Sequence, residues 1–284
     1  MLEVPRARRY SLVLLLAATA HASNATSRLA FGSCSKVHLP QPLWPYVRAR
    51  SPKAWIWAGD AVYGDRLVRA LPLTFEAMGP QYLRDAYATQ NAIPEYARLR
   101  EEVPYFIASW DDHDFGLNDG GGDLPWRDAS QAVFLAAMNL SVPSGQHGVY
   151  TRTRVPVEGG AVLVVALDLR YHKSPYTNVE GDFLGEAQWA WLVAKPLLQN
   201  YPATLVTSGS YMFASAGMSL AGGDAGNGPT LGRSRSEPQA YQASLGGLPT
   251  PASVFVSIVR NKPSCLLSVH QSHRRQSIDS ALQT

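Results

Sequence analysis

The feature that most constrains this 284-residue chain is a set of short apolar runs that each end in polar residues. The runs are predicted strands, and they cover residues 28–31, 54–58, 105–110, 161–167 and 203–207. Helical periodicity lies between and around them, over residues 42–50, 74–90, 92–101, 127–139 and 185–195. Strands that alternate with helices indicate a layered α/β domain. Ligands in such domains bind beyond the carboxyl ends of the strands, so the polar residues there are candidate site residues.

The composition fits a folded domain with a large core. Hydrophobic residues make up 46% of the chain and charged residues 17%, with a formal net charge of +3. Residues 1–22 hold three Arg and one Glu, so without them the balance is 22 basic against 21 acidic residues, a net charge of +1. No basic stripe is present, and specific nucleic-acid binding is not expected.

The N-terminus has the pattern of a secretory signal peptide. Basic residues from Arg6 to Arg9 precede an apolar run over residues 12–20, and Ala20-His21-Ala22 has small residues where a cleavage site needs them. We therefore predict a signal peptide over residues 1–22 and a secreted or extracytoplasmic protein. The alternative is a buried N-terminal helix. No other window approaches 18 apolar residues, so no membrane span is expected in the mature chain.

The rest of the chain divides into two parts by composition. Residues 23–221 carry the strand and helix patterns and form the predicted domain. Residues 222–284 are rich in Gly, Ser, Pro and Arg, and we predict a largely irregular tail in which only residues 253–259 resemble a strand.

Asp60 follows the second predicted strand directly, and Tyr63 lies three residues further on. A carboxylate in this place can bridge two cations, and a phenolate is a hard ligand suited to ferric iron. The alternative is structural: Asp60 caps a turn and Tyr63 packs against the core. Asp65 and Arg66 are expected to be ordinary surface residues.

The third predicted strand ends in a dense acidic cluster. Asp111-Asp112-His113-Asp114 opens a stretch of five carboxylates between residues 111 and 123. Crowded like charges are costly unless cations or protons compensate them, which favours a metal or catalytic role over a solvated acidic loop. Cys34 ends the first predicted strand, where it is either a small buried apolar residue or a thiolate ligand.

Together these motifs resemble the PhoD-like (alkaline phosphatase D) family of secreted metallophosphoesterases. The resemblance covers residues 28–213, and its motifs occur in the family's order: Phe31-Gly32-Ser33-Cys34, Trp57-Ala58-Gly59-Asp60-Ala61-Val62-Tyr63-Gly64-Asp65, Trp110-Asp111-Asp112-His113-Asp114, Asp168-Leu169-Arg170-Tyr171-His172 and the segment 184–192. The resemblance implies an α/β/β/α sandwich with a multinuclear centre of iron and calcium, although other divalent cations are possible.

The same resemblance implies roles for individual residues. Cys34, Asp60 and Tyr63 would be iron ligands, with Asp60 shared between cations. Asp112 would stand where related enzymes place a bridging Asn, as a further metal ligand, and His113 would contact the substrate phosphate or protonate the leaving group. Asn118 and Arg170 would support the site or the substrate, although a structural salt bridge is an equal interpretation for Arg170.

One family motif is missing. Family members have a late Ser-Gly-Asp-x-His segment after a further core strand, and here Ser208-Gly209 leads into the Gly-rich tail instead. We therefore expect a sandwich that is incomplete at its C-terminus. The predicted function is an exported hydrolase of small-molecule, lipid or nucleotide phosphoesters, either a phosphomonoesterase or a phosphodiesterase, that uses a water activated by metal. One alternative is an inactive relative that binds metal or phosphate groups without turnover, and another is a fragment that does not fold.

Overall fold

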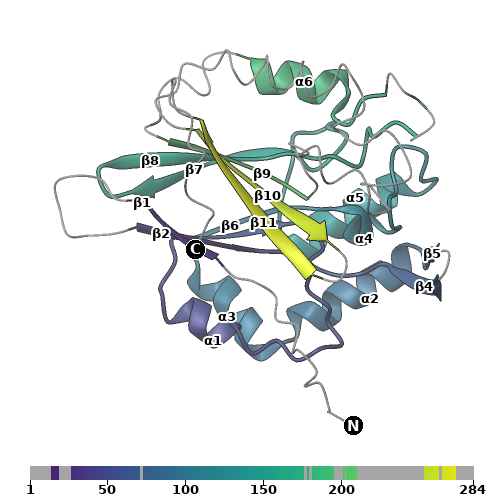
Figure 1. Cartoon of the computed structure of the whole chain (residues 1–284), viewed down its shortest axis with the longest axis horizontal. Helices are drawn as coiled ribbons and strands as arrows, with labels where there is room; N and C mark the ends of the chain where they lie inside the picture. Colours follow the sequence, from purple (N-terminus) through teal and green to yellow (C-terminus); the bar gives the residue numbers. More distant parts are fainter. Residues whose placement is uncertain are drawn as a thin grey trace, which may run out of the picture.

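The computed structural model describes residues 14–18, 27–70, 73–175, 178, 181–194, 201, 203–209, 253–261 and 264–272. Two β-sheets lie face to face in it, with helices on both outer sides (Figure 1). The helices are α1 Trp44–Arg48, α2 Pro80–Asn91, α3 Pro94–Glu102, α4 Asp112–Phe115, α5 Arg127–Met138 and α6 Gly185–Val193.

The first sheet has the strand order β1-β2-β3-β6, in which β2, β3 and β6 are parallel. The second has the order β11-β10-β9-β8-β7, with β8, β9 and β10 parallel. Strands β4 and β5 form a separate hairpin. The bounds are β1 Leu14–Ala18, β2 Ser27–Gly32, β3 Ala54–Ala58, β4 Asp65–Ala70, β5 Leu73–Ala77, β6 Tyr105–Ser109, β7 Thr151–Val157, β8 Gly160–Ala166, β9 Ala203–Ser208, β10 Ser253–Asn261 and β11 Ser264–Ser272.

The alternation of side chains along β8 shows how the layers stack. Val162 and Val164 pack against the first sheet, in a cluster with Phe31 and Ile56. Their neighbours on the opposite face join a cluster with α6, through residues that include Leu163, Val165 and Leu192. A third cluster fills the space between the first sheet and the helices α1, α2, α3 and α5. The layers are therefore helix, sheet, sheet and helix, which confirms the predicted α/β/β/α sandwich.

One predicted helix was wrong in its first part. Residues 74–90 were expected to form one helix, but strand β5 occupies Leu73–Ala77 and α2 starts only at Pro80. Gly79 has a φ of 87°, which ends the strand conformation, and Pro80 suits the first position of a helix because its missing N–H needs no partner there. Gly79 and Pro80 therefore separate β5 from α2, although the apolar periodicity of residues 74–90 predicts one continuous helix.

Two predictions about the chain ends stay predictions. Within residues 1–22 the structure describes only β1, which pairs antiparallel with β2, and this pairing does not test the signal peptide. Within residues 222–284 it describes β10, which includes the expected strand 253–259, and β11, which was not expected. Both extend the sheet beyond β9, and the segment 211–252 lies outside the described residues. In the part of the chain that is described, no helix is long and apolar enough to cross a membrane.

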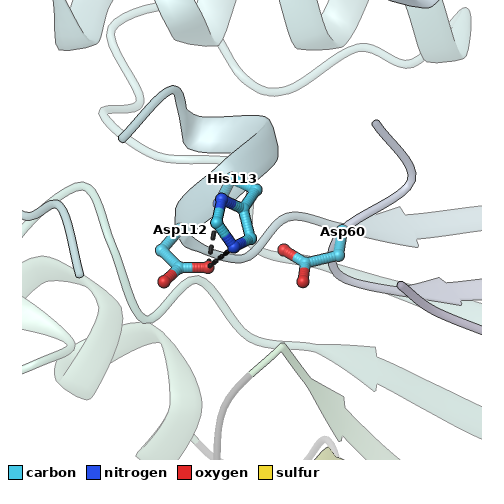
Figure 2. A group of neighbouring side chains, drawn as sticks. All are labelled: Asp60, Asp112 and His113. Atoms are coloured by element: carbon cyan, nitrogen blue, oxygen red, sulfur yellow. Dashed lines mark hydrogen bonds and ion pairs between the residues drawn. The ribbon is translucent and has the colours of Figure 1, made fainter. Parts of the chain in front are cut away.

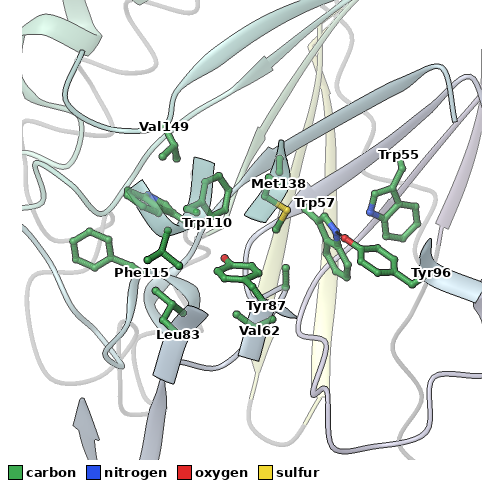
Figure 3. Close-up of a cluster of buried hydrophobic side chains, with 14 of the residues drawn as sticks. Trp55, Trp57, Val62, Leu83, Tyr87, Tyr96, Trp110, Phe115, Met138 and Val149 are labelled. Carbon is green, nitrogen blue, oxygen red and sulfur yellow. Dashed lines mark hydrogen bonds between the residues drawn. The ribbon is translucent and has the colours of Figure 1, made fainter. Parts of the chain in front are cut away.

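The core between the first sheet and its helices is rich in aromatic rings. Trp57 donates a hydrogen bond from its indole Nε1 to the hydroxyl of Tyr96 at 2.9 Å, and both side chains are buried (Figure 3). Burial raises the pKa of Tyr96 to about 12, because an ionised phenol is costly away from water.

We expect Tyr96→Phe to lower the free energy of unfolding by about 1–3 kcal/mol, because the Trp57 N–H loses its partner in the core. Tyr96 stabilises the fold fully below its unfolded pKa near 10.0, and this contribution of about 2–3 kcal/mol is lost as the pH rises through about 12. Chemical denaturation at alkaline pH checks both points. A Tyr96→Phe protein whose stability falls with pH as steeply as that of the wild type would contradict this assignment.

Candidate metal centre

The carboxyl ends of β3, β6 and β9 meet at one place, as the sequence pattern predicts. Gly59 follows β3, Asp111 comes shortly after β6, and Gly209 follows β9. The three backbones approach so closely that a Cβ on Gly59 would lie 2.6 Å from the Cβ of Asp111 and 2.9 Å from the Cα of Gly209. Glycine is required at these two places because no side chain fits between the strand ends.

Asp60 enters this site from a strained turn. Its φ is 53°, a left-handed conformation that non-glycine residues adopt at a cost, and Gly59 before it has a φ of 83°. The turn is anchored by the backbone N–H of Ala61, which donates to Oδ2 of Asp114 at 3.0 Å. The fold thus holds a buried carboxylate in an unfavourable backbone conformation, and strain of this kind concentrates at functional sites.

Asp112 and His113 reach the same place from the first turn of α4. Asp112 accepts hydrogen bonds from the backbone N–H groups of His113, at 2.9 Å, and Asp119, at 2.8 Å. Figure 2 shows the imidazole of His113 between the carboxylates of Asp112 and Asp60. All three side chains are buried, and one ligand atom of each lies within 4.8 Å of the others.

Cys34 and Tyr63 both converge on Asp60. The Cys34 sulfur lies 3.7 Å from its Oδ2 atom, and the Tyr63 hydroxyl donates to the same oxygen at 3.4 Å. Cys34 also has a positive φ, 56°. The structure therefore brings together the three residues that the resemblance assigns to iron. Cys34 is disulfide-bonded here, so the thiolate that iron ligation needs forms only after reduction.

The remaining acids of the cluster have structural partners. Asp111 forms an ion pair with Arg170, from Oδ1 to Nε at 2.7 Å and to Nη2 at 2.5 Å, and the Arg170 side chain is fully buried. Asp114 accepts from the backbone N–H groups of Asp111, at 2.5 Å, and Ala61. Burial raises the pKa of Asp114 well above its usual value, against the opposing effect of these hydrogen bonds. For Arg170, the geometry is that of the structural salt bridge.

Asn118 lies at the edge of the site. Its side-chain amide donates to Oδ2 of Asp119 at 2.6 Å, and its backbone N–H donates to Oδ2 of Asp65 at 2.6 Å. The expectation that Asp65 lies on the surface was wrong. Its side chain is only 1% exposed and bonds Nδ1 of His113 at 2.7 Å, whereas Arg66 beside it is exposed as expected. Spacing along the chain gives no sign that the hairpin turns Asp65 inward.

A cation fits the chemistry of these residues. Two carboxylates and an imidazole share a buried volume, and like charges at this separation oppose each other unless a cation compensates them. Carboxylate oxygen and imidazole nitrogen are ligands for Mg²⁺, Ca²⁺, Mn²⁺, Zn²⁺ and iron. Asp60, Asp112 and His113 are therefore a candidate metal centre, with Cys34 and Tyr63 on the Asp60 side.

Comparisons with known proteins find similarity in structure but not in sequence. No family model matches the chain, and no curated protein matches it. A solved structure of PhoD superposes with a TM-score of 0.58 at 13% sequence identity, over 82% of this chain. The match covers 53% of the PhoD chain, so this chain spans about half the length of that protein. The predicted resemblance is thus confirmed in three dimensions: the chain has the fold of PhoD over part of the PhoD structure.

Proposed function

We propose that this protein is a metal-dependent phosphoester hydrolase. The observation that carries the proposal is the buried group of Asp60, Asp112 and His113 at the strand ends of a PhoD-like sandwich. A single fold hosts many activities, so the argument depends on the site and not on the fold alone. Two close carboxylates and an imidazole, buried together where ligands bind in α/β sheets, are suited to metal-assisted hydrolysis.

Each residue has a part that follows from its position. A bound cation supplies Lewis acidity, which lowers the pKa of a coordinated water and offsets negative charge that develops on the phosphate oxygens. Asp60 and Asp112 would hold the cation, and His113 would act through Nε2, either on the cation or on a phosphate oxygen. Arg170 would support the site indirectly. Its ion pair with Asp111 holds the short connection between the end of β6 and the start of α4.

Iron together with calcium is our specific proposal for the metals. Support comes from the sulfur of Cys34 and the hydroxyl of Tyr63, which both lie against the same oxygen of Asp60. Thiolate and phenolate ligands favour ferric iron, whereas an oxygen-rich set suits calcium. Because Cys34 is disulfide-bonded, we expect more iron in protein prepared with a non-thiol reductant than without it.

The test is hydrolysis of an aryl phosphomonoester and an aryl phosphodiester, each releasing nitrophenolate, by protein loaded with iron and calcium. We expect turnover by the wild type and a loss of at least about 100-fold in Asp112→Ala. Asp123→Ala is the matched control, because Asp123 is an exposed carboxylate in the segment between α4 and α5, and its loss should leave the rate unchanged. Metal binding without turnover of either ester would support the inactive relative and contradict a hydrolase.

Export is a further part of the proposal. The basic residues, apolar run and small-residue cleavage pattern of residues 1–22 support it. Expression of the full chain with its own N-terminus, followed by N-terminal sequencing of secreted protein, should find residue 23 first. Retention of residues 1–22 in the cell-associated protein would contradict export.

A further inference from the structure

The hairpin of β4 and β5 carries neighbouring apolar side chains on its surface. Leu67 is 50% exposed and Val68 is 60% exposed, and they are two of the five large hydrophobic residues that are exposed in the described part of the chain. Leu71 and Pro72, which separate the two strands in the sequence, are apolar as well. Single exposed apolar residues are common, whereas neighbouring ones on one element mark an interaction surface. We propose that this hairpin docks the protein on the surface of an anionic phospholipid membrane.

A β-bulge accounts for the exposure of two consecutive apolar residues. Leu67 pairs with Phe75 and Arg69 pairs with Thr74, so Val68 is an extra residue between the two pairs. In a regular strand Leu67 and Val68 would face opposite sides, and a bulge interrupts this alternation. The hairpin lies at one end of the molecule and belongs to neither of the two large sheets (Figure 1). An element in this place can contact an extended surface while the sandwich stays outside it.

Cationic side chains accompany the apolar ones. Arg66 and Arg69 are exposed residues of β4, and Arg66 pairs with Glu76 of β5 at 2.7 Å. Lys36 is also exposed, and its Nζ lies over the ring of Tyr63, 5.0 Å from the ring centroid. These exposed residues therefore bring three positive charges and one negative charge to the surface. Arg and Lys place their apolar stems beside acyl chains and their charges at the level of the lipid phosphates, so the surface fits anionic headgroups.

The apolar surface continues from the candidate metal centre. Asp65 bonds the ring of His113, and the ring of Phe75 lies 5.4 Å from the same imidazole. Leu67 pairs with Phe75 and therefore projects from the same face of the hairpin. A membrane that takes up Leu67 would bring lipid phosphates near the candidate centre. This last consequence rests on the proposed hydrolase, whereas docking itself does not depend on turnover.

A second copy of the chain is the main alternative partner for the hairpin. Stable protein–protein interfaces bury about 1,200–2,000 Å² around an apolar centre, whereas this surface offers Leu67 and Val68 between arginines. Two identical cationic surfaces also repel each other. A lipid surface needs only a few apolar side chains, because anionic headgroups add electrostatic attraction to their burial. The observations therefore favour a membrane.

The test is co-sedimentation of the full-length protein with lipid vesicles. One set contains phosphatidylcholine alone, and the other contains phosphatidylcholine with about one-third phosphatidylglycerol, which is anionic. We expect the wild type to bind the anionic vesicles more tightly and to be released as the salt concentration rises. Combined Leu67→Ser and Val68→Ser substitutions should weaken binding by at least about 10-fold, because two apolar side chains no longer enter the lipid. Tyr46→Ser is the matched control, because Tyr46 is 72% exposed on α1, which lies away from the hairpin (Figure 1).

A charge variant tests the same surface without changing its apolar residues. Arg69→Gln should weaken binding to the anionic vesicles by about five-fold and leave binding to phosphatidylcholine unchanged. Arg154→Gln on β7 is its control, because Arg154 is also an exposed arginine on a strand and lies outside the hairpin.

Several results would overturn the proposal. One is a wild type that binds neither set of vesicles, and another is wild-type binding by the folded Leu67→Ser, Val68→Ser protein. If that protein does not unfold cooperatively, Arg69→Gln decides, and wild-type binding by it would contradict docking. A lipid-free dimer that the Leu67→Ser, Val68→Ser protein no longer forms would assign the hairpin to a second copy instead. Vesicle binding that needs the hairpin, without hydrolysis of any ester, would support docking and contradict only the proposed function.

Discussion

Asp60→Asn is expected to lose the bound metal and to reduce phosphoester hydrolysis by at least about 100-fold, while the metal-free protein stays folded. Asn is the best substitution because it is among the non-glycine residues that tolerate a positive φ, and Asp60 has a φ of 53°. The change therefore removes the charge without adding backbone strain. The Oδ2 atom that faces Cys34 and Tyr63 would become part of an amide, a much weaker ligand for a cation.

We do not expect Asp60→Asn to destabilise the metal-free protein, although it should abolish metal binding. Asp60 and Asp112 are buried carboxylates that share one site, so the metal-free protein should be as stable as the wild type or more stable once one charge is removed. Thermal unfolding of both proteins after chelation measures this. Asp123→Asn serves as the control, since it removes an exposed charge. A metal content in Asp60→Asn equal to that of the wild type would show that the cation lies elsewhere.

Arg170→Ala is expected to cause the largest loss of stability, about 3–5 kcal/mol. The Arg170 side chain is fully buried, and its guanidinium bonds Asp111 through two nitrogens. Removing it takes this ion pair from the Asp111 carboxylate, whose side chain is only 10% exposed. For a domain of this size the loss corresponds to a decrease in Tm of roughly 10 °C.

Two further variants test whether the buried charge of Asp111 causes the loss of stability in Arg170→Ala. Arg154→Ala removes an exposed arginine from β7 and should change the free energy of unfolding by less than about 0.5 kcal/mol. Arg170→Ala combined with Asp111→Ala should be more stable than Arg170→Ala alone, because the buried carboxylate that lost its ion pair is then removed as well. If the double variant lost the sum of both single effects, the ion pair would not explain the stability of this region.

The sequence predicted the layers of the fold because its strands are short and strongly apolar. Runs such as residues 54–58 and 161–167 match β3 and β8 within a residue or so, and the polar residues after β3 and β6 meet as expected. Elements on the surface were harder to predict. Strands β4 and β5 were missed because an exposed two-stranded hairpin needs no apolar alternation, and residues 74–77 continued the periodicity of α2.

Within the site, the sequence identified the residues but not their pairing. Asp60, Asp112 and His113 were candidates from their places at strand ends, and the structure brings them together. Four consecutive polar residues, however, looked alike in the sequence. A short helix after β6 directs Asp112 and His113 to the site, Asp111 to Arg170 and Asp114 to the backbone of the Asp60 turn. Asp65 was misassigned because its burial depends on the hairpin fold.

The most direct test of the metal centre is elemental analysis of the purified full-length protein after dialysis, combined with a check of cooperative unfolding. We expect a near-integer ratio of metal to protein, with iron and calcium as the metals and a loss of both in Asp60→Asn. A cooperatively folded wild type that retains no metal, and takes up none when iron and calcium are supplied with a reductant, would contradict a metal centre at Asp60, Asp112 and His113.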